Sequence, residues 1–512
     1  MQKKPKRLAP KPQYLSSSQL VLAGFETPFS QHLKKDNRWV VLGALIPWDE
    51  ICPMYLKVFE RSNTGRKPLN PRIILGALII KHMCNLDDRE TIDQISENVY
   101  MQYFLGYSSF NTEPPFDASL FVEIRKRLGI ETLNAINEKI VAIKTRMETS
   151  VPISSSKEEE KNNAAVPRDE EPENKGRILF DATACPQDIA YPTDLNLLSD
   201  AREKSEQLID KIYDANLHIK KPRTYRKIAR KEYLQTAQKK NKTRKEIRKA
   251  IRKQLGYVGR NISSIHSLLD AYPTIPFNYR EHKYFFVIQT ILEQQTLMFQ
   301  NHIHTIEDRI VSIHQPHVRP IVRGKSQSKV EFGSKIHLSL IDGISFLDEL
   351  SWDAYNEGSH MMQYVEQYRK RFGFYPREIL ADKIYCTREN RKELKEKKII
   401  LIAKPLGRPS AVADHIRPGE RNPVEGKFGQ AKTAYGLNRI GARLKDTSQS
   451  WIASIILVLN LVKLAGVALY CLIINKSINI LGQYLGCVIR ELKQLLYEKM
   501  LPCNVLSSYS YT

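Results

Sequence analysis

Apolar residues recur at helical spacing through the first part of the chain. The segments 71–86 and 87–107 carry apolar residues at helical spacing, Pro71 suits the first turn of a helix, and a third helix is predicted at 117–129. Arginine and lysine gather at the end of the third segment, before Gly129, as is common where a helix ends. The pattern predicts a compact all-α unit.

The pattern changes to short apolar runs after residue 176. Strand character is found at 177–187, 309–313, 335–353, 377–385 and 399–404. Asp342 and Gly343 divide the third of these runs as a hairpin turn would. Helical segments at 358–372 and 387–397, and helices from about residue 420 onwards, alternate with or follow the strands. This order predicts a mixed α/β domain.

Changes of composition divide the chain. We predict a basic arm at 1–35, an all-α N-terminal domain at 36–149, a polar linker at 150–176, an α/β domain at 177–475 with a basic helical insertion at 198–305, and a C-terminal amphipathic helix and tail at 476–512. The amphipathic pattern of the last unit covers residues 481–500.

Charge indicates a polyanionic partner. The 512 residues contain 79 Lys and Arg against 56 Asp and Glu, a formal net charge of +23. Residues 220–260 alone hold 17 basic residues against Glu232 and Glu246. Nucleic acid is the partner we expect for this stretch, and a solvated helical face is the alternative. The basic residues expected to contact DNA are Arg226, Lys227, Arg230, Arg248, Lys249, Arg252 and Lys253. The N-terminal helices could bind DNA too, or serve in packing or dimerisation.

Other features bear on the compartment. The seven cysteines form no CxxC pair, and the N-terminus lacks the apolar run of a signal peptide, so we expect a cytoplasmic, nucleoid-associated protein. Residues 451–475 are apolar enough for a membrane span, but Lys463 and Asn460 lie within them. A buried core helix is therefore the prediction, and a membrane-surface protein the weakest alternative.

Common cofactor and hydrolase motifs do not fit. The chain lacks GxGxxG and GxSxG, and the GKS at 324–326 lacks the earlier glycine of a P-loop because position 319 is Arg. His314 and His317 could suggest a metal, but we expect hydrogen-bonded structural histidines there.

Carboxylates at strand ends offer a chemical alternative. Asp181 follows the run ILF, where we expect a buried strand to end, and Asp382 follows another short strand. A helix near 421–432 could add a glutamate. Such a cluster could hold two Mg²⁺ ions about 3.5–4 Å apart and promote phosphodiester transfer. Taken singly, Asp181 could be a cap at a strand end and Asp382 a turn residue.

Residues 421–432 resemble the signature of insertion-sequence transposases of the DDE class. Arg421, Glu425 and Lys432 have the family's spacing of three and six intervening residues. The family tyrosine three positions before the arginine is Pro418 here, which puts in doubt any step that relies on that tyrosine. ILFDAT and LADKIYCTREN resemble the two aspartate strands, and 68–107 and 319–343 resemble further segments of the same proteins. The insertion-sequence group numbered 1182 is the most similar group we can name.

The resemblance implies an RNase H-like catalytic core that cuts DNA at the terminal inverted repeats of a mobile element and joins the ends to target DNA. Asp181 would bridge two Mg²⁺ ions, for which Mn²⁺ could substitute, and Asp382 and Glu425 would each anchor one. Arg421 and Lys432 would hold phosphates near the cleavage point.

The sequence leaves a second interpretation open. A non-catalytic DNA-binding protein on an RNase H-like scaffold would use the basic insertion and the helical domain alone. The clustered carboxylates argue against it, because a pure binder has no use for them beside phosphate. For the transposase we expect double-stranded DNA as partner, a homodimer acting on two element ends, and no membrane.

Overall fold

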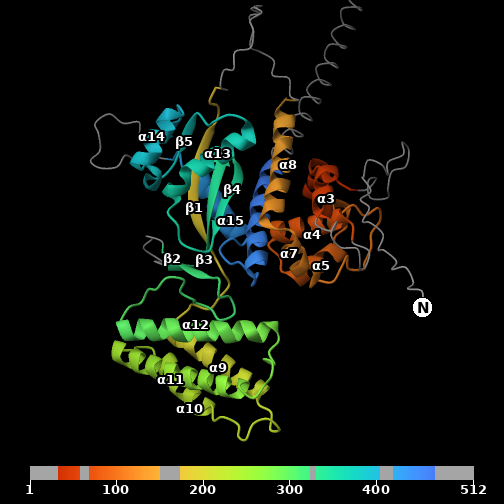
Figure 1. The fold of residues 1–512 in the computed structure, drawn as a ribbon. Helices are drawn as coiled ribbons and strands as arrows, with labels where there is room; N and C mark the ends of the chain where they lie inside the picture. The colour runs from red at the N-terminus through yellow and green to blue at the C-terminus, as the bar shows by residue number, and fades with distance from the viewer. Residues whose placement is uncertain (1–32, 58–68, 150–172, 323–329, 404–418, 467–512) are drawn as a thin grey trace, which may run out of the picture.

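The computed structural model describes residues 33–57, 69–149, 173–322, 330–403 and 419–466 (Figure 1). In the described residues before the first strand, all regular elements are helices. They are α2 (Arg38–Leu45), α3 (Trp48–Leu56), α4 (Pro71–Cys84), α5 (Asp88–Glu97), α6 (Val99–Phe104), α7 (Leu120–Arg127) and α8 (Ile130–Thr149).

Local caps explain where these helices begin. Pro71 is the first residue of α4, as predicted, and the Asn70 side chain accepts a hydrogen bond from the Arg72 backbone N–H. The stripe expected over 87–107 is divided between α5 and α6. Asn98 has extended backbone and its side chain accepts from the N–H groups of Tyr100 and Met101, so a new helix starts there.

A mixed sheet lies at the centre of the α/β region. Its strands are β1 (Arg177–Pro186), β2 (Arg319–Val322), β3 (Val330–Ile341), β4 (Ile344–Ser351), β5 (Glu378–Leu380) and β6 (Ile400–Ile402). The order is β2-β3-β1-β5-β6, and β4 also pairs with β3. Pairs among β1 to β4 are antiparallel, whereas β1 pairs with β5, and β5 with β6, in parallel.

The hairpin predicted at Asp342 and Gly343 is confirmed. Both residues have positive φ, 48° and 79°, as a two-residue turn between right-twisted strands requires, and they join β3 to β4. The strand predicted at 309–313 is wrong. Residues 309–313 form an irregular segment, in which Ile310 and Ile313 are buried against the helices of the insertion. Their apolar pattern therefore reflects burial rather than pairing in a sheet.

Helices follow the strands as the sequence predicts. They are η3 (Glu357–His360), α13 (Met361–Phe372), η4 (Lys383–Tyr385), α14 (Arg388–Glu396), α15 (Asn422–Ala434) and a last described helix at Lys445–Gly466. One apolar cluster includes side chains of the N-terminal helices, the sheet, α13, α15 and the last helix. In Figure 1, α8 and the last helix lie side by side between the sheet and the other N-terminal helices.

The helix Lys445–Gly466 is long and apolar enough to cross a membrane, but 72% of its most apolar 18-residue window is buried inside the protein. Its Asn460 is fully buried and donates to Ser345 O at 2.7 Å and to Asn137 Oδ1 at 2.9 Å. A core helix accounts for this burial, and no membrane span is indicated. Residues 467–475 and the amphipathic segment 481–500 lie outside the described residues.

The basic insertion forms a helical bundle with an apolar core of its own. Its helices are α9 (Asp194–Ile212), α10 (Arg226–Ala237), α11 (Arg244–Leu269) and α12 (Tyr279–Asn301). Leu198, Ile209, Val258, Ile265 and Ile288 are among the buried side chains of this core. Figure 1 shows the bundle beyond the end of the sheet at which β2 lies, with α12 nearest the strands.

Candidate active site

Strand register places Asp181 and Asp382 side by side. The parallel pairing of β1 with β5 aligns Leu179 with Leu380. Asp181 and Asp382 follow these partners by two residues each, so both lie at the same level of the sheet. The expectation that the strand ends at Asp181 is wrong: β1 continues to Pro186 because β3 pairs with it along that whole length. Only the pairing with β5 stops before the aspartate.

Arg421 joins the two carboxylates. It stands at the N-terminus of α15, which packs against β1. Its Nη2 lies 3.3 Å from Asp181 Oδ2, and its Nη1 lies 3.5 Å from Asp382 Oδ1. The Asp181 side chain is 22% exposed and that of Asp382 55%. Three chain segments thus meet at one cation.

Glu425 and Lys432 lie on the helix that Arg421 begins. Glu425 is in the first turn of α15 and is exposed, and Lys432 is in the last turn and half-buried. Lys432 follows Glu425 by seven positions, about two helical turns, so both lie on the same side of α15. Glu425 is close enough to act electrostatically on Asp181.

Burial dominates the acidity of Asp181. It raises the pKa of this carboxyl above its ordinary value, and the Arg421 guanidinium and the Ala182 backbone N–H oppose that rise. The charges of Asp382 and Glu425 raise the pKa further. A nearby cation would therefore favour the ionised form of the cluster.

The donor chemistry fits a hard divalent cation. Carboxylate oxygens are the ligands that Mg²⁺ and Mn²⁺ prefer, and Asp181 and Asp382 already direct oxygens toward one positive group, the Arg421 guanidinium. In the part of the chain that the structure describes, no three His, Cys, Asp or Glu side chains are grouped closely enough to hold a metal ion. The aspartate pair fits such an ion, whereas a complete set of three ligands is not assembled.

The basic residues predicted to contact DNA are not gathered around the carboxylates. They lie on α10 and α11 of the bundle, two helices joined by a 3.0 Å hydrogen bond from Gln254 to Ala229 O. Lys227, Arg230, Lys249 and Arg252 are exposed. The other three have partners within the bundle: Arg226 contacts Asp210, Lys253 contacts Glu232, and Arg248 donates to Phe299 O.

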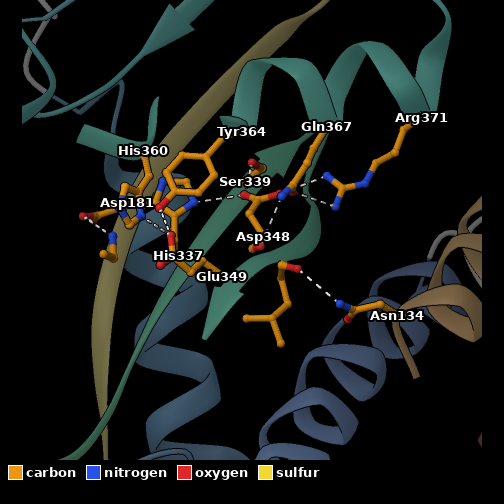
Figure 2. Close-up of polar contacts among 12 residues, drawn as sticks. Asn134, Asp181, His337, Ser339, Asp348, Glu349, His360, Tyr364, Gln367 and Arg371 are labelled. Atoms are coloured by element: carbon orange, nitrogen blue, oxygen red, sulfur yellow. Dashed lines mark hydrogen bonds and ion pairs between the residues drawn. The ribbon is translucent and has the colours of Figure 1, made fainter. Parts of the chain in front are cut away.

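A buried polar network that the sequence did not reveal lies on the α13 side of the sheet (Figure 2). A β-bulge in β4 pairs Leu347 with Leu338 and Glu349 with His337, which leaves Asp348 as the extra residue. The consecutive side chains Asp348 and Glu349 therefore both reach toward α13 instead of alternating between faces.

Each carboxylate of this network has more than one polar partner. Asp348 is completely buried, accepts a hydrogen bond from Ser339 and lies 3.0 Å from His337 Nδ1 and 2.9 Å from Arg371 Nη1. Glu349 accepts from Tyr364 and lies 2.8 Å from His360 Nδ1. In the sequence, this network is indicated only by the two successive acids of the strand ISFLDELS. The same pattern is typical of a strand whose end reaches the surface.

The prediction of hydrogen-bonded structural histidines at HQPH is confirmed for His314, whereas the buried Nε2 of His317 has no hydrogen-bond partner among the described residues. His314 Nδ1 lies 2.9 Å from the Tyr284 hydroxyl, and the His317 ring packs edge-on against Trp352 with 4.4 Å between centroids. Burial lowers the pKa of both imidazoles, that of His317 to about 4. Both are therefore neutral at pH 7.

Comparison with known proteins agrees with the motifs. Residues 27–127 match the family model described as "Transposase domain (DUF772)", and residues 379–462 match the model described as "Transposase DDE domain". The first covers α2 to α7, and the second includes Asp382, Arg421, Glu425 and Lys432. Together the two matches support a similarity to insertion-sequence DDE transposases and indicate a transposase function.

A curated relative matches about a third of the chain. It is an uncharacterized protein, ORF8 in the nfe locus of Rhizobium meliloti, 28% identical over 158 residues. The match covers 31% of this chain and 66% of the relative. No solved structure gives a significant match.

Proposed function

We propose that this protein is the transposase of an insertion sequence, of the type grouped under the number 1182, and that it binds terminal inverted repeats and catalyses metal-dependent DNA cleavage and strand transfer. The observation that carries the proposal is the meeting of Asp181, Asp382 and Arg421, from three distant segments, beside Glu425. A binding protein gains nothing from paired carboxylates next to phosphate, because they repel it.

Topology supports an RNase H-like core. The antiparallel strands β4, β3 and β1 are followed by β5 and β6, which run parallel to β1, and α13 and α14 connect the later strands. In this arrangement Asp181 lies on the central strand and Asp382 directly follows its parallel neighbour. The core is the catalytic domain at 177–475 of our proposal, with the insertion at 198–305.

Asp181, Asp382 and Glu425 are the residues that would hold two Mg²⁺ or Mn²⁺ ions. When bound, such ions activate the attacking hydroxyl and stabilise the leaving oxygen in phosphodiester transfer. Asp181 is the shared ligand in this proposal because it is the most enclosed of the three acids. Because burial raises the pKa of Asp181, a bound cation would favour its ionised form.

Arg421 and Lys432 would hold phosphates next to the cleavage point. The Arg421 side chain is 19% exposed, and two of its guanidinium nitrogens face the carboxylates. The planar guanidinium has five N–H donors, so it can contact the acids and a phosphate at the same time. Lys432 lies on the same side of α15 as Glu425 and would provide a second positive charge for phosphate, further along the helix than Arg421.

The basic bundle would bind the DNA that leads to the site. Its exposed cations on α10 and α11 provide contacts to phosphate without sequence preference. Because an element has two ends, we propose a homodimer on double-stranded DNA, in the cytoplasm and associated with the nucleoid. A non-catalytic DNA-binding protein is the alternative, supported by the same bundle.

Cleavage of a plasmid tests the proposal. The plasmid carries the gene with its native flanking DNA and is incubated with purified protein and either Mg²⁺ or EDTA. We expect metal-dependent cuts at inverted repeats on both sides, which Asp382→Ala abolishes. Tight DNA binding without any cut by the wild-type protein would favour the non-catalytic alternative.

A further inference from the structure

The turn that follows β5 fixes the backbone of Asp382. The short helix η4 starts at the next residue, and its first N–H, that of Lys383, donates to Asp382 Oδ1 at 2.7 Å. At the other end of η4, the Tyr385 N–H donates to Asp382 O at 3.1 Å. A shift of η4 would therefore move Asp382 with it.

The Tyr385 ring anchors η4 in the core below the site. The side chain is buried and packs near Phe180 and His337, with ring centroids 6.1 and 5.9 Å apart. Phe180 directly precedes Asp181. The backbones that carry the two aspartates are thus supported by the same aromatic cluster.

Asn390 makes a second connection from outside η4. It lies in the first turn of α14 and is 5% exposed. Its Nδ2 donates to Tyr385 O at 2.9 Å and to Gly358 O at 2.7 Å. The amide therefore uses both of its hydrogens to hold the end of η4 against η3.

The two short helices meet backbone to backbone at this point. A Cβ atom added at Gly358 would lie 2.3 Å from Ile384 O, much closer than any normal contact. Only glycine at position 358 lets η3 approach η4 closely enough for one amide to reach both carbonyl groups.

We propose that Asn390 is a positioning residue for the carboxylate of Asp382, and that Gly358 is required for the same contact. The inference rests on the proposed function in so far as Asp382 is a metal ligand. Groups that orient a ligand through its own support typically change metal affinity by about 10–100-fold when removed. Asn390 acts through the η4 backbone and does not touch the carboxylate itself.

A merely structural amide elsewhere in the fold provides a matched control. Asn460 is likewise buried and donates to Ser345 O and Asn137 Oδ1, in the contact between the last described helix, α8 and β4. Its replacement by alanine removes a buried amide of the same kind without touching η3 or η4.

The test compares the full-length wild-type protein with Asn390→Ala, Gly358→Ala, Asn460→Ala and Asp382→Ala. Mn²⁺ alone is titrated and followed by electron paramagnetic resonance, and hydrogen exchange of the Tyr385 and Cys386 amides is measured in parallel. We expect Asn390→Ala and Gly358→Ala to accelerate this exchange and to weaken Mn²⁺ binding by about 10–100-fold. Asn460→Ala should lower the melting temperature with unchanged Mn²⁺ affinity.

Two results would overturn the inference in distinguishable ways. If Asp382→Ala weakens Mn²⁺ binding but Asn390→Ala and Gly358→Ala bind it as the wild type does, the positioning role is wrong and the proposed metal site stands. If Asp382→Ala binds Mn²⁺ as tightly as the wild type, the proposed metal site is wrong and the positioning role falls with it. Should Asn390→Ala not fold, Gly358→Ala carries the same comparison.

Discussion

The guanidinium of Arg421 lies 3.3 Å from the carboxylate of Asp181, where the N-terminus of α15 packs against β1. The acid is partly buried, and burial raises its pKa, while the arginine charge lowers it. Burial and the Arg421 charge are the two largest effects on the ionisation of Asp181, they oppose each other, and a single substitution removes the second.

Replacing Arg421 by glutamine should move the acid limb of the cleavage rate to higher pH. Without the guanidinium the pKa of Asp181 rises further, so the ionised form disappears at a higher pH. The plateau rate should also fall by roughly 10–100-fold, because Arg421 would no longer make its proposed charge-assisted hydrogen bond to a phosphate, which is worth about 1.5–3 kcal/mol. Single-turnover cleavage measured across pH tests this. Arg439→Gln, which removes a surface pair with Asp188, serves as control and should leave the profile in place.

Asp181→Asn should stabilise the fold at neutral pH. The folded-state pKa of Asp181 lies above its unfolded value, so the folded protein loses stability as pH rises through the interval between the two. Asparagine avoids that loss. Urea unfolding should give a higher midpoint for the variant at pH 7, and the difference should shrink as pH is lowered toward 4. A lower midpoint at pH 7 would contradict the pKa direction.

Exposed cations of the bundle should determine the salt dependence of DNA binding. Removing one cation that pairs with a phosphate reduces the slope of log affinity against log salt by about 0.9. Replacing Lys249 and Arg252 by glutamine should therefore reduce the slope by nearly 2. Lys370→Gln, an exposed lysine on α13, is the control for charge alone. An equal reduction in the single control and the double variant would argue against a binding face on the bundle.

Asp348→Ala should destabilise the protein severely. The carboxylate is fully buried and is shared by Arg371, His337 and Ser339. Its removal leaves the buried His337 and Ser339 side chains without this partner and leaves Arg371 with Glu138 as its remaining carboxylate. Loss of one partner of a buried pair costs about 3–5 kcal/mol. Denaturant unfolding measures this cost, and Asp353→Ala, at an exposed position two residues after β4, should change stability little.

Features set by neighbouring residues were predictable from the sequence. The start of α4 at Pro71 and the hairpin at Asp342 and Gly343 depend on local backbone preferences, and both are confirmed. The division at Asn98 was also encoded locally, but an uninterrupted apolar stripe concealed it.

Features set by pairing between distant segments were not predictable. The apolar pattern of 309–313 is the same for a strand and for a segment buried against helices. The alignment of Asp181 with Asp382 depends on the register of β1 and β5. Asp348 and Glu349 both face α13 because of the β-bulge opposite His337. Composition cannot specify a register. The resemblance to transposases supplied the identity of the acids, and the strand pairing supplied their proximity.

The separate apolar core of the α9–α12 bundle has a consequence for how this chain can change over generations. Substitutions that lengthen or recharge the bundle are absorbed inside it, because its buried side chains belong to its own helices and to the segment that returns to β2. The N-terminal helices have no such independence, since they share one core with the sheet and the last described helix. The packing therefore tolerates remodelling of the bundle, whereas a substitution in the N-terminal helices must also fit the sheet and the last described helix.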